Sequence, residues 1–528
     1  MKIIATKDKI MNNCNIKSII SNYNIIYLFD FVTILIIVSV MIIYSKKYLF
    51  SGISFDEQAF LWQGWNIIKG EIPYRDFSEI KPPVIFFMNA LSIILFGLEN
   101  MKFKIMPLIL IYPSIVIFYL TLRRLRVNIL LGFIISIHIV FIIFNPSFHD
   151  GVINDTETYG LVFSLVGFSL ICWNINNVKK KLYIRNIFGG IFLALSVLSK
   201  EPFLLVVISI LLTTYYFYII NKRKYIYYYY LNIFIGIIIP FLLTILYLIS
   251  NNAILYYYDS LKSSLLYAGS YAKDLGLYPY RSFIGTIIYD IKKLYENYYN
   301  LDLLLILIPY YIAFYYKYKI SYFSIINIVG ILIGCYGISI GHCFWKHYYL
   351  IGTMGLLLPA IYGSIYLSKL FNKLKLTNIL LLIICIQMIF ITINQNINNI
   401  ITDFRQKHAK IEYEIPFQLK TIVYKHTTTE DYILVTEEPI LYVYLNRKHS
   451  LKTAVFFDEL IIYYKGNTFE EKFNNVRLEL EERKPKVIYI PANGILKPRQ
   501  QKYFNYVIYP IIKKYNYTNI DNSIYYLN

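Results

Sequence analysis

Over residues 1–396 the chain alternates long apolar blocks with short polar loops, and the blocks support the first structural prediction. Most blocks are about 20 residues long, the length that a helix needs to cross a hydrocarbon core of about 30 Å. Their apolar residues do not alternate with a period of two, as the strands of a membrane barrel would. The pattern therefore predicts a polytopic α-helical membrane protein.

The basic loops set the predicted orientation of these helices, because Lys and Arg concentrate in cytoplasmic loops. Lysines before the first block place the N-terminus in the cytoplasm, and later basic loops pair the blocks into hairpins that turn on the outer side. This threading gives about eleven spans and leaves the C-terminal part extracytoplasmic, outside the cell membrane. The predicted spans lie near residues 25–44, 105–122, 127–144, 158–175, 186–199, 203–220, 229–250, 301–316, 320–341, 348–367 and 377–395.

Three segments between the spans are treated separately. Residues 46–83 form the first outer loop, and a long outer loop is expected between residues 250 and 301. Residues 84–97 form an apolar block of only 14 residues. At 1.5 Å per residue such a helix reaches about 21 Å, which is short of a full span. This block is therefore predicted to be a re-entrant or interfacial helix.

The composition of the chain changes near residue 397. Short strand-like runs at residues 432–435 and 486–490 alternate with an amphipathic helical stretch at residues 469–483. We therefore predict two domains. Residues 1–396 form the multi-span membrane domain, and residues 397–528 form a small soluble α/β domain on the outer side.

Composition and charge support the membrane assignment. Hydrophobic residues make up 57% of the chain and charged residues only 16%, which excludes a soluble enzyme and a disordered chain. The formal net charge of +20 could indicate a nucleic-acid partner, but the basic clusters lie between apolar blocks, so no such partner is predicted. The five cysteines are scattered and predict neither a disulfide framework nor a metal site.

The threading places several charged side chains on the same outer face, although the carboxylates were not used to build it. Asp56 and Glu57 follow the first span and open an amphipathic stretch. They could be a helix cap and a first-turn acid. Alternatively, Asp56 is a carboxylate held above the lipid surface that takes a proton from an attacking hydroxyl.

The other candidates on this face also allow two interpretations each. Lys81 precedes two prolines and is either a snorkelling lysine or a fixed ammonium for a phosphate. The pair Asp155 and Glu157 repeats the acid-before-helix pattern and allows the same capping interpretation. Lys200 interrupts an apolar stretch together with Glu201 and Pro202, which indicates a hairpin tip or a polar cavity. His347 lies among tyrosines at the start of a span and is either part of an interfacial aromatic belt or a donor to phosphate.

The order of residues in the first outer loop resembles that of the polytopic GT-C glycosyltransferases, in particular the branch similar to protein mannosyltransferases and aminoarabinose transferases (glycosyltransferase family 39-like). The resemblance covers about 30 residues and depends on the order and spacing of short motifs. It consists of the acid pair Asp56-Glu57, a helix, the run from Gly70 through Tyr74 to Asp76, and Lys81-Pro82-Pro83. Weaker matches extend through most of the membrane region.

The resemblance implies transfer of a sugar, with inversion, from a polyprenyl-phosphate donor to a hydroxyl of a lipid, a cell-envelope glycan or a protein. It implies catalytic roles for Asp56 with Glu57 and a donor-phosphate role for Lys81. Asp155 with Glu157 matches the second acidic motif of the family, and Lys200 and His347 match phosphate-binding positions more weakly. Glu201 departs from the family, in which glycine is common there. No cofactor is implied, although a divalent metal could replace or assist the lysine.

Two other functions share parts of this pattern. A lipid-linked polysaccharide polymerase or ligase is also polytopic and uses lipid-linked donors. A lipid-linked sugar transporter or flippase would instead carry ionisable groups near the bilayer midplane, on broken helices. Clustering of the charges at one surface favours chemistry or binding there. The paired acids argue against a scaffold that only displays the C-terminal domain.

Overall fold

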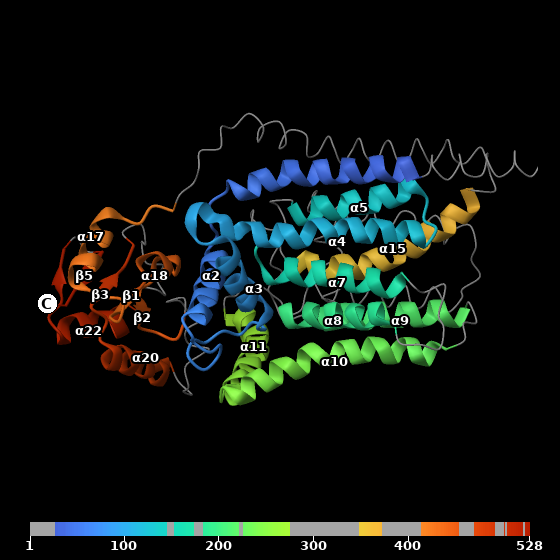
Figure 1. Cartoon of the computed structure of the whole chain (residues 1–528). Coiled ribbons are helices and arrows are strands. Elements are labelled where there is room, and N and C mark those ends of the chain that lie inside the picture. Colours follow the sequence, from blue (N-terminus) through green and yellow to red (C-terminus); the bar gives the residue numbers. More distant parts are fainter. Residues whose placement is uncertain are drawn as a thin grey trace, which may run out of the picture.

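The computed structural model describes residues 27–144, 153–173, 183–220, 225–274, 348–371, 413–453, 469–491, 501, 504–520 and 523–527. The predicted spans at 301–316, 320–341 and 377–395, His347 and the predicted domain boundary at residue 397 lie outside these residues. Within them, long apolar helices run side by side as a bundle (Figure 1). The bundle contains the helix Tyr27–Leu49, α4 (Ile105–Arg124), α5 (Ile129–Phe144), α7 (Thr156–Cys172), α8 (Ile184–Ser199), α9 (Phe203–Ile220), α10 (Ile226–Ser250) and α15 (Tyr349–Phe371).

Every predicted span that falls on described residues coincides with one of these helices. By length and composition, three described helices could cross a membrane: Tyr27–Leu49, Lys102–Arg124 and α10. Within the described residues, the apolar stretches of the other helices are shorter than 18 residues. The number of about eleven spans therefore stays a prediction. In such helices the backbone N–H and C=O groups form hydrogen bonds within the same segment, as the interior of a bilayer requires.

Three further helices lie at one end of the bundle, between it and the C-terminal part of the chain (Figure 1). They are α2 (Phe55–Ile68), α3 (Val84–Phe96) and α11 (Ile254–Asp274). The helix α3 corresponds to the short apolar block of residues 84–97 and begins directly after Pro83. The helix α11 lies where the sequence predicted a long loop. We call this end of the molecule the α2 end.

Helices α2 and α3 approach each other closely at Gly64. A Cβ atom added there would lie 2.6 Å from the backbone nitrogen of Ala90 and 2.7 Å from the carbonyl carbon of Asn89. Real Cβ atoms do not tolerate such distances to backbone atoms, so only glycine fits at this crossing. The contact fixes the loop between the two helices, residues 69–83, from both sides.

Replacing Gly64 with alanine should therefore destabilise the α2 end. We expect the free energy of unfolding to fall by about 1–3 kcal/mol, the usual cost of overpacking a tight contact. Thermal unfolding of the purified protein in detergent measures the change. Gly52→Ala is the matched control, since a Cβ atom at Gly52 has no neighbour within 4 Å. Equal stability of the two variants would contradict the close contact.

The C-terminal part forms a small mixed sheet covered by helices. The strand order is β2-β1-β3-β5-β4, in which β1 pairs in parallel with β2 and β3, and β5 pairs antiparallel with β3 and β4. The predicted strands at 432–435 and 486–490 and the predicted helix at 469–483 are present as β1, β3 and α20. The elements are α17 (Phe417–His426), β1 (Tyr432–Val435), α18 (Ile440–Leu445), β2 (Lys448–His449), α20 (Phe469–Arg483), β3 (Val487–Tyr489), η4 (Phe504–Ile508), α22 (Tyr509–Lys514), β4 (Thr518–Asn519) and β5 (Ile524–Tyr526).

The sheet unit is attached to α2 and the loop after it by buried contacts. His449 lies edge-on to the fully buried Trp62, with ring centroids 4.8 Å apart, and its Nε2 is 2.9 Å from a carboxylate oxygen of Glu71. The amide of Ser78 donates to the carbonyl of Lys452 at 2.6 Å. These contacts bring the sheet unit next to the segment that carries the candidate site residues.

Candidate functional site

The first candidate, Asp56, lies in the opening turn of α2. Ser54 is the N-cap of this helix, and Ser54 and Glu57 form a capping box. The carboxylate of Glu57 accepts from the amide of Ser54 at 3.1 Å and from the hydroxyl of Tyr48 at 3.0 Å. Asp56 is therefore not the cap, and its half-buried carboxylate is not needed to satisfy the helix end.

Glu57 has a different environment from its neighbour. Its side chain is buried, and burial raises the pKa of its carboxyl against the opposing charge of Lys104. Burial disfavours the ionised form of an acid, which explains the direction. The two members of the acid pair are thus unlike: Glu57 is held by hydrogen bonds inside the structure, while Asp56 interacts electrostatically with Lys81.

The buried Lys104 fixes the backbone that leads into α2. Its ammonium donates to the carbonyl oxygens of Ser51 at 2.9 Å and Gly52 at 2.8 Å, and more weakly to that of Tyr48 at 3.3 Å. The side chain is fully buried and its nitrogen lies 4.8 Å from the ring centre of Tyr48. A buried ammonium needs such partners. The sequence analysis did not identify this residue.

Lys81 is held at the end of the loop between α2 and α3. Its ammonium lies 4.6 Å from the ring centre of Phe60 on α2. Its carbonyl oxygen accepts from the hydroxyl of Tyr74 at 2.8 Å, and its amide donates to the carboxylate of Glu79 at 3.3 Å. Tyr74 is a buried tyrosine with a φ of +70°, an unfavourable backbone conformation for this residue type. Strain of this kind is common at functional sites.

The charges around Lys81 come from distant parts of the sequence. Burial favours the neutral form of its side chain, but the neighbouring carboxylates, Asp56 foremost, outweigh burial and raise the pKa of the ammonium. Glu79 and Glu157 act in the same direction, and Lys200 opposes them. The structure therefore brings Asp56, Lys81, Glu157 and Lys200 into one electrostatic cluster, which we call the Lys81 cluster.

Lys200 forms the second cationic part of the Lys81 cluster. It lies in the turn between α8 and α9, and its ammonium is 2.8 Å from the carboxylate of Glu157 at the start of α7. Both side chains are largely buried, with 12% and 3% exposed. The ammonium also lies 4.8 Å from the ring centre of Tyr348, next to the start of α15. Burial opposes the charge on Lys200, but Glu157 raises its pKa well above the usual range.

The remaining acids have separate roles in the geometry. Asp155 is the N-cap of α7 and accepts from the amide of Thr158 at 2.6 Å, so the capping interpretation holds for it. Glu201 follows Lys200, and burial raises the pKa of its carboxyl, although the charge of Lys200 opposes that change. His347 lies outside the described residues. Among the described residues, no group of three or more His, Cys, Asp or Glu side chains could hold a metal ion.

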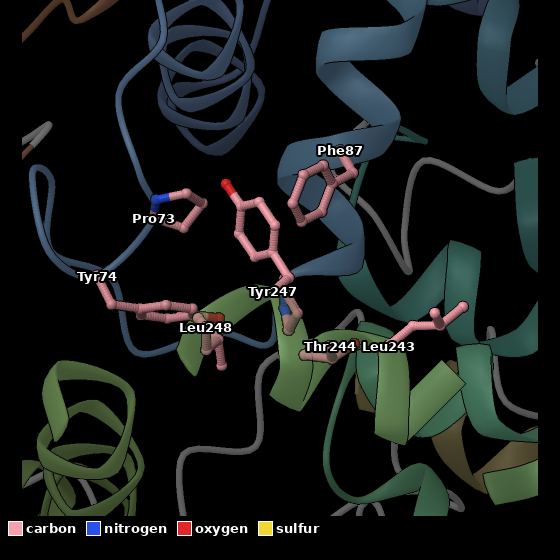
Figure 2. A pocket seen from close by; sticks show the side chains of 8 residues that line it. Pro73, Tyr74, Phe87, Leu243, Thr244, Tyr247 and Leu248 are labelled. Atoms are coloured by element: carbon pink, nitrogen blue, oxygen red, sulfur yellow. The ribbon is translucent and has the colours of Figure 1, made fainter. Parts of the chain in front are cut away.

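An apolar cavity of about 240 Å³ lies beside the loop that carries Lys81. Figure 2 shows the ring of Tyr247 from α10 lying between Pro73 and Phe87. Its wall also contains Tyr74, Pro83, Leu243, Thr244 and Leu248. Phe87 and Leu243 are 38% and 61% exposed, so the cavity continues into an apolar outer surface of the bundle. Sequence reasoning did not locate this cavity, because its wall combines a loop with two helices distant in sequence.

No protein-family model and no curated protein sequence matches the chain. Among solved structures, the chain is similar to an oligosaccharyltransferase of Archaeoglobus fulgidus. The crystal structure of its complex with zinc and sulfate has a TM-score of 0.48 at 13% sequence identity, over 94% of this chain and 73% of that chain.

Two other structures of that enzyme are similar to the chain. Its apo form has a TM-score of 0.39 at 13% identity, over 92% of this chain and 72% of that chain. The form in complex with an inhibitory peptide and a dolichol-phosphate has a TM-score of 0.36 at 11% identity, over 93% and 74%. With TM-scores below 0.5, this likeness assigns neither a fold family nor an activity. The resemblance to the mannosyltransferase-like branch stays a prediction.

Proposed function

We propose that the chain is a membrane glycosyltransferase that moves a sugar from a polyprenyl-phosphate donor to a hydroxyl of an acceptor, with inversion. The observation that supports it most is the Lys81 cluster. There a half-buried carboxylate, Asp56, interacts electrostatically with the ammonium of Lys81, and the ammonium of Lys200, which Glu157 holds, also acts on Lys81. This pairing of a base with fixed cations suits attack by an alcohol and departure of a phosphate.

In the proposed reaction, the acceptor oxygen attacks the anomeric carbon from the face opposite the phosphate. The bond between that carbon and the phosphate oxygen breaks, and the bonding electrons leave with the polyprenyl phosphate. Asp56 takes the proton of the acceptor hydroxyl as the new bond forms. General-base assistance of this kind contributes about 10²–10⁴-fold to a rate.

The lysines would act on the leaving group. As the carbon–oxygen bond breaks, negative charge grows on the phosphate, and Lys81 with Lys200 would stabilise it. Cations fixed in a water-poor site stabilise the charge of a transition state far more than cations in solution do, because they need not be reoriented during the step. Glu157 would hold Lys200 in position, and we propose that His347, which precedes Tyr348, approaches the same phosphate.

The apolar cavity beside Tyr74 would take the first isoprene units of the donor. Its lining is almost entirely apolar, and it is continuous with exposed apolar side chains of α3 and α10. A lipid tail lying there would place its phosphate near the loop that carries Lys81. This arrangement requires the α2 end to lie at a membrane surface. We propose that this is the outer surface, with the sheet unit outside the cell membrane and the N-terminus in the cytoplasm.

Profiling of lipid-linked sugars in a deletion strain tests the proposal. We expect a polyprenyl-phosphate sugar to accumulate and one cell-envelope acceptor to lose that sugar, and we expect the wild-type gene to reverse both changes. A strain with unchanged lipid-linked sugars would contradict the proposal. Accumulation on the cytoplasmic leaflet alone would instead favour a flippase.

Replacing Lys81 with alanine should lower sugar transfer about 10²-fold, the cost of losing one donor to a developing negative charge. We expect the KM for the lipid-linked donor to rise and Lys81→Arg to retain more activity than Lys81→Ala, since arginine keeps the charge. Steady-state kinetics of the purified protein measure both. Lys102→Ala is the control, because Lys102 is an exposed lysine of η1 (Glu99–Lys104). An unchanged donor KM for Lys81→Ala would argue against the phosphate role.

A further inference from the structure

A second cavity, of about 340 Å³, lies between the loop of residues 69–83, α11 and the sheet unit. Its volume falls within the range of ordinary small-molecule sites. Unlike the cavity beside Phe87, it is lined mainly by residues that carry polar or charged groups. Among the described residues, those that line it are Tyr74, Ser78, Glu79, Tyr256, Asp259, Ser260, Ser263, Lys452, Asn475 and Glu479.

The lining has a definite chemical character. The described lining includes three carboxylates and one lysine, and it stays net acidic when Arg483, 3.1 Å from Glu479, is counted. It therefore favours neutral or cationic groups over a phosphate. Glu79 already accepts from the side chain of Gln63 and the amide of Ile80, and Glu479 from the amide of Lys452. A carboxylate or hydroxyl oxygen can accept more than one hydrogen bond, so the lining can still accept the hydroxyl protons of a ligand. Tyr256, which is 47% exposed, presents a ring at the rim on which an apolar face of a ligand could lie.

The polar cavity is connected to the Lys81 cluster through two residues. Tyr74 lines both cavities and donates a hydrogen bond to the carbonyl oxygen of Lys81. Glu79 lines the polar cavity, accepts from the amide of Lys81, and contributes to the field at its ammonium. The apolar and polar cavities therefore both border the loop that would bind the donor phosphate.

We infer that the polar cavity is the acceptor site and that the acceptor is a carbohydrate that presents neutral hydroxyl-rich rings. This inference rests on the proposed function and adds the acceptor class to it. The sheet unit contributes Lys452, Asn475 and Glu479, so it completes the site instead of merely being displayed. An anionic lipid headgroup does not fit the excess of carboxylates.

Saturation-transfer NMR with the full chain in lipid nanodiscs tests the inference directly. The probes are neutral methyl glycosides of glucose, galactose and mannose, with glycerol 1-phosphate as an anionic polyol. We expect at least one glycoside to bind and glycerol 1-phosphate not to bind. Binding of glycerol 1-phosphate alone, or of no glycoside, would overturn the inference.

Variants at the rim locate the binding. Tyr256→Ala and Asp259→Asn should each weaken glycoside binding about tenfold, which corresponds to the loss of a stacking or charged hydrogen-bond contact. The control is Tyr258→Ala, on the same helix but outside the cavity lining and 65% exposed. Equal weakening by Tyr258→Ala would overturn the assignment.

The two claims can fail separately. Asp56 is outside the polar cavity, so Asp56→Asn should keep glycoside binding while it loses transfer. If Asp56→Asn still transfers sugar, the proposed chemistry fails whatever the glycosides do. If transfer depends on Asp56 but Tyr256→Ala leaves both glycoside binding and the acceptor KM unchanged, the acceptor site fails and the proposed chemistry stands.

Discussion

Replacing Asp56 with asparagine should lower the rate of sugar transfer about 10²–10⁴-fold, the share that a general base supplies. Asparagine has the same shape but cannot accept the proton of the acceptor hydroxyl. It also removes the carboxylate that acts most strongly on Lys81, so the donor phosphate would meet an altered field. The expected result is a fall in kcat with a much smaller change in the donor KM.

The fold should tolerate this substitution, which makes the result interpretable. The capping box of α2 uses Ser54 and Glu57, and neither depends on Asp56. Thermal unfolding of Asp56→Asn should therefore match the wild type. Glu99→Gln serves as the control, because Glu99 is an acid in the first turn of η1 whose side chain is 86% exposed. Normal turnover by Asp56→Asn would remove Asp56 from the mechanism.

Replacing Glu157 with glutamine should destabilise the protein by about 3–5 kcal/mol, the usual effect of breaking a buried ion pair. The substitution keeps the size of the side chain but leaves the ammonium of Lys200 in a buried place without its closest counter-charge. Transfer should fall as well, since Lys200 would no longer be held. Thermal unfolding in detergent and a transfer assay measure the two effects.

A surface pair in the same chain provides the comparison. Glu430 and Lys448 are 2.6 Å apart, but their side chains are 77% and 43% exposed. Exposed pairs of this kind contribute only about 0–1 kcal/mol, so Glu430→Gln should change the unfolding temperature little. The double variant Glu157→Leu with Lys200→Met should recover much of the lost stability without recovering transfer. A Glu157→Gln variant as stable as Glu430→Gln would show that the pair is not buried in solution.

The helices of the bundle could be predicted from sequence because their signal is local. A block of apolar residues of the right length predicts a helix wherever it occurs, and α4, α8 and α9 begin and end within a few residues of the predicted bounds. The strand β1 and the helix α20 also have local signals, which are a short run of strand-forming residues and an amphipathic pattern. The helix α11 was missed because its mixed tyrosine-rich sequence has no continuous apolar block.

The candidate site could be predicted only in part. Acids and lysines in outer loops can be named from the sequence, but their pairing cannot. Glu157 opens α7 and Lys200 lies in the turn between α8 and α9, and nothing in either local pattern indicates their contact at 2.8 Å. Glu79 and Lys104 were overlooked because each has an ordinary neighbourhood in the sequence, and only tertiary contacts show their roles.

The carbonyl contacts of Lys104 also affect the energy of the proposed reaction. Its ammonium lies beside the negative end of the helix Tyr27–Leu49 and ties down the chain that enters α2. The opening turn of α2 is therefore preorganised before a substrate arrives. No binding energy need be spent on ordering this segment, so the affinity of the donor can go toward lowering the barrier.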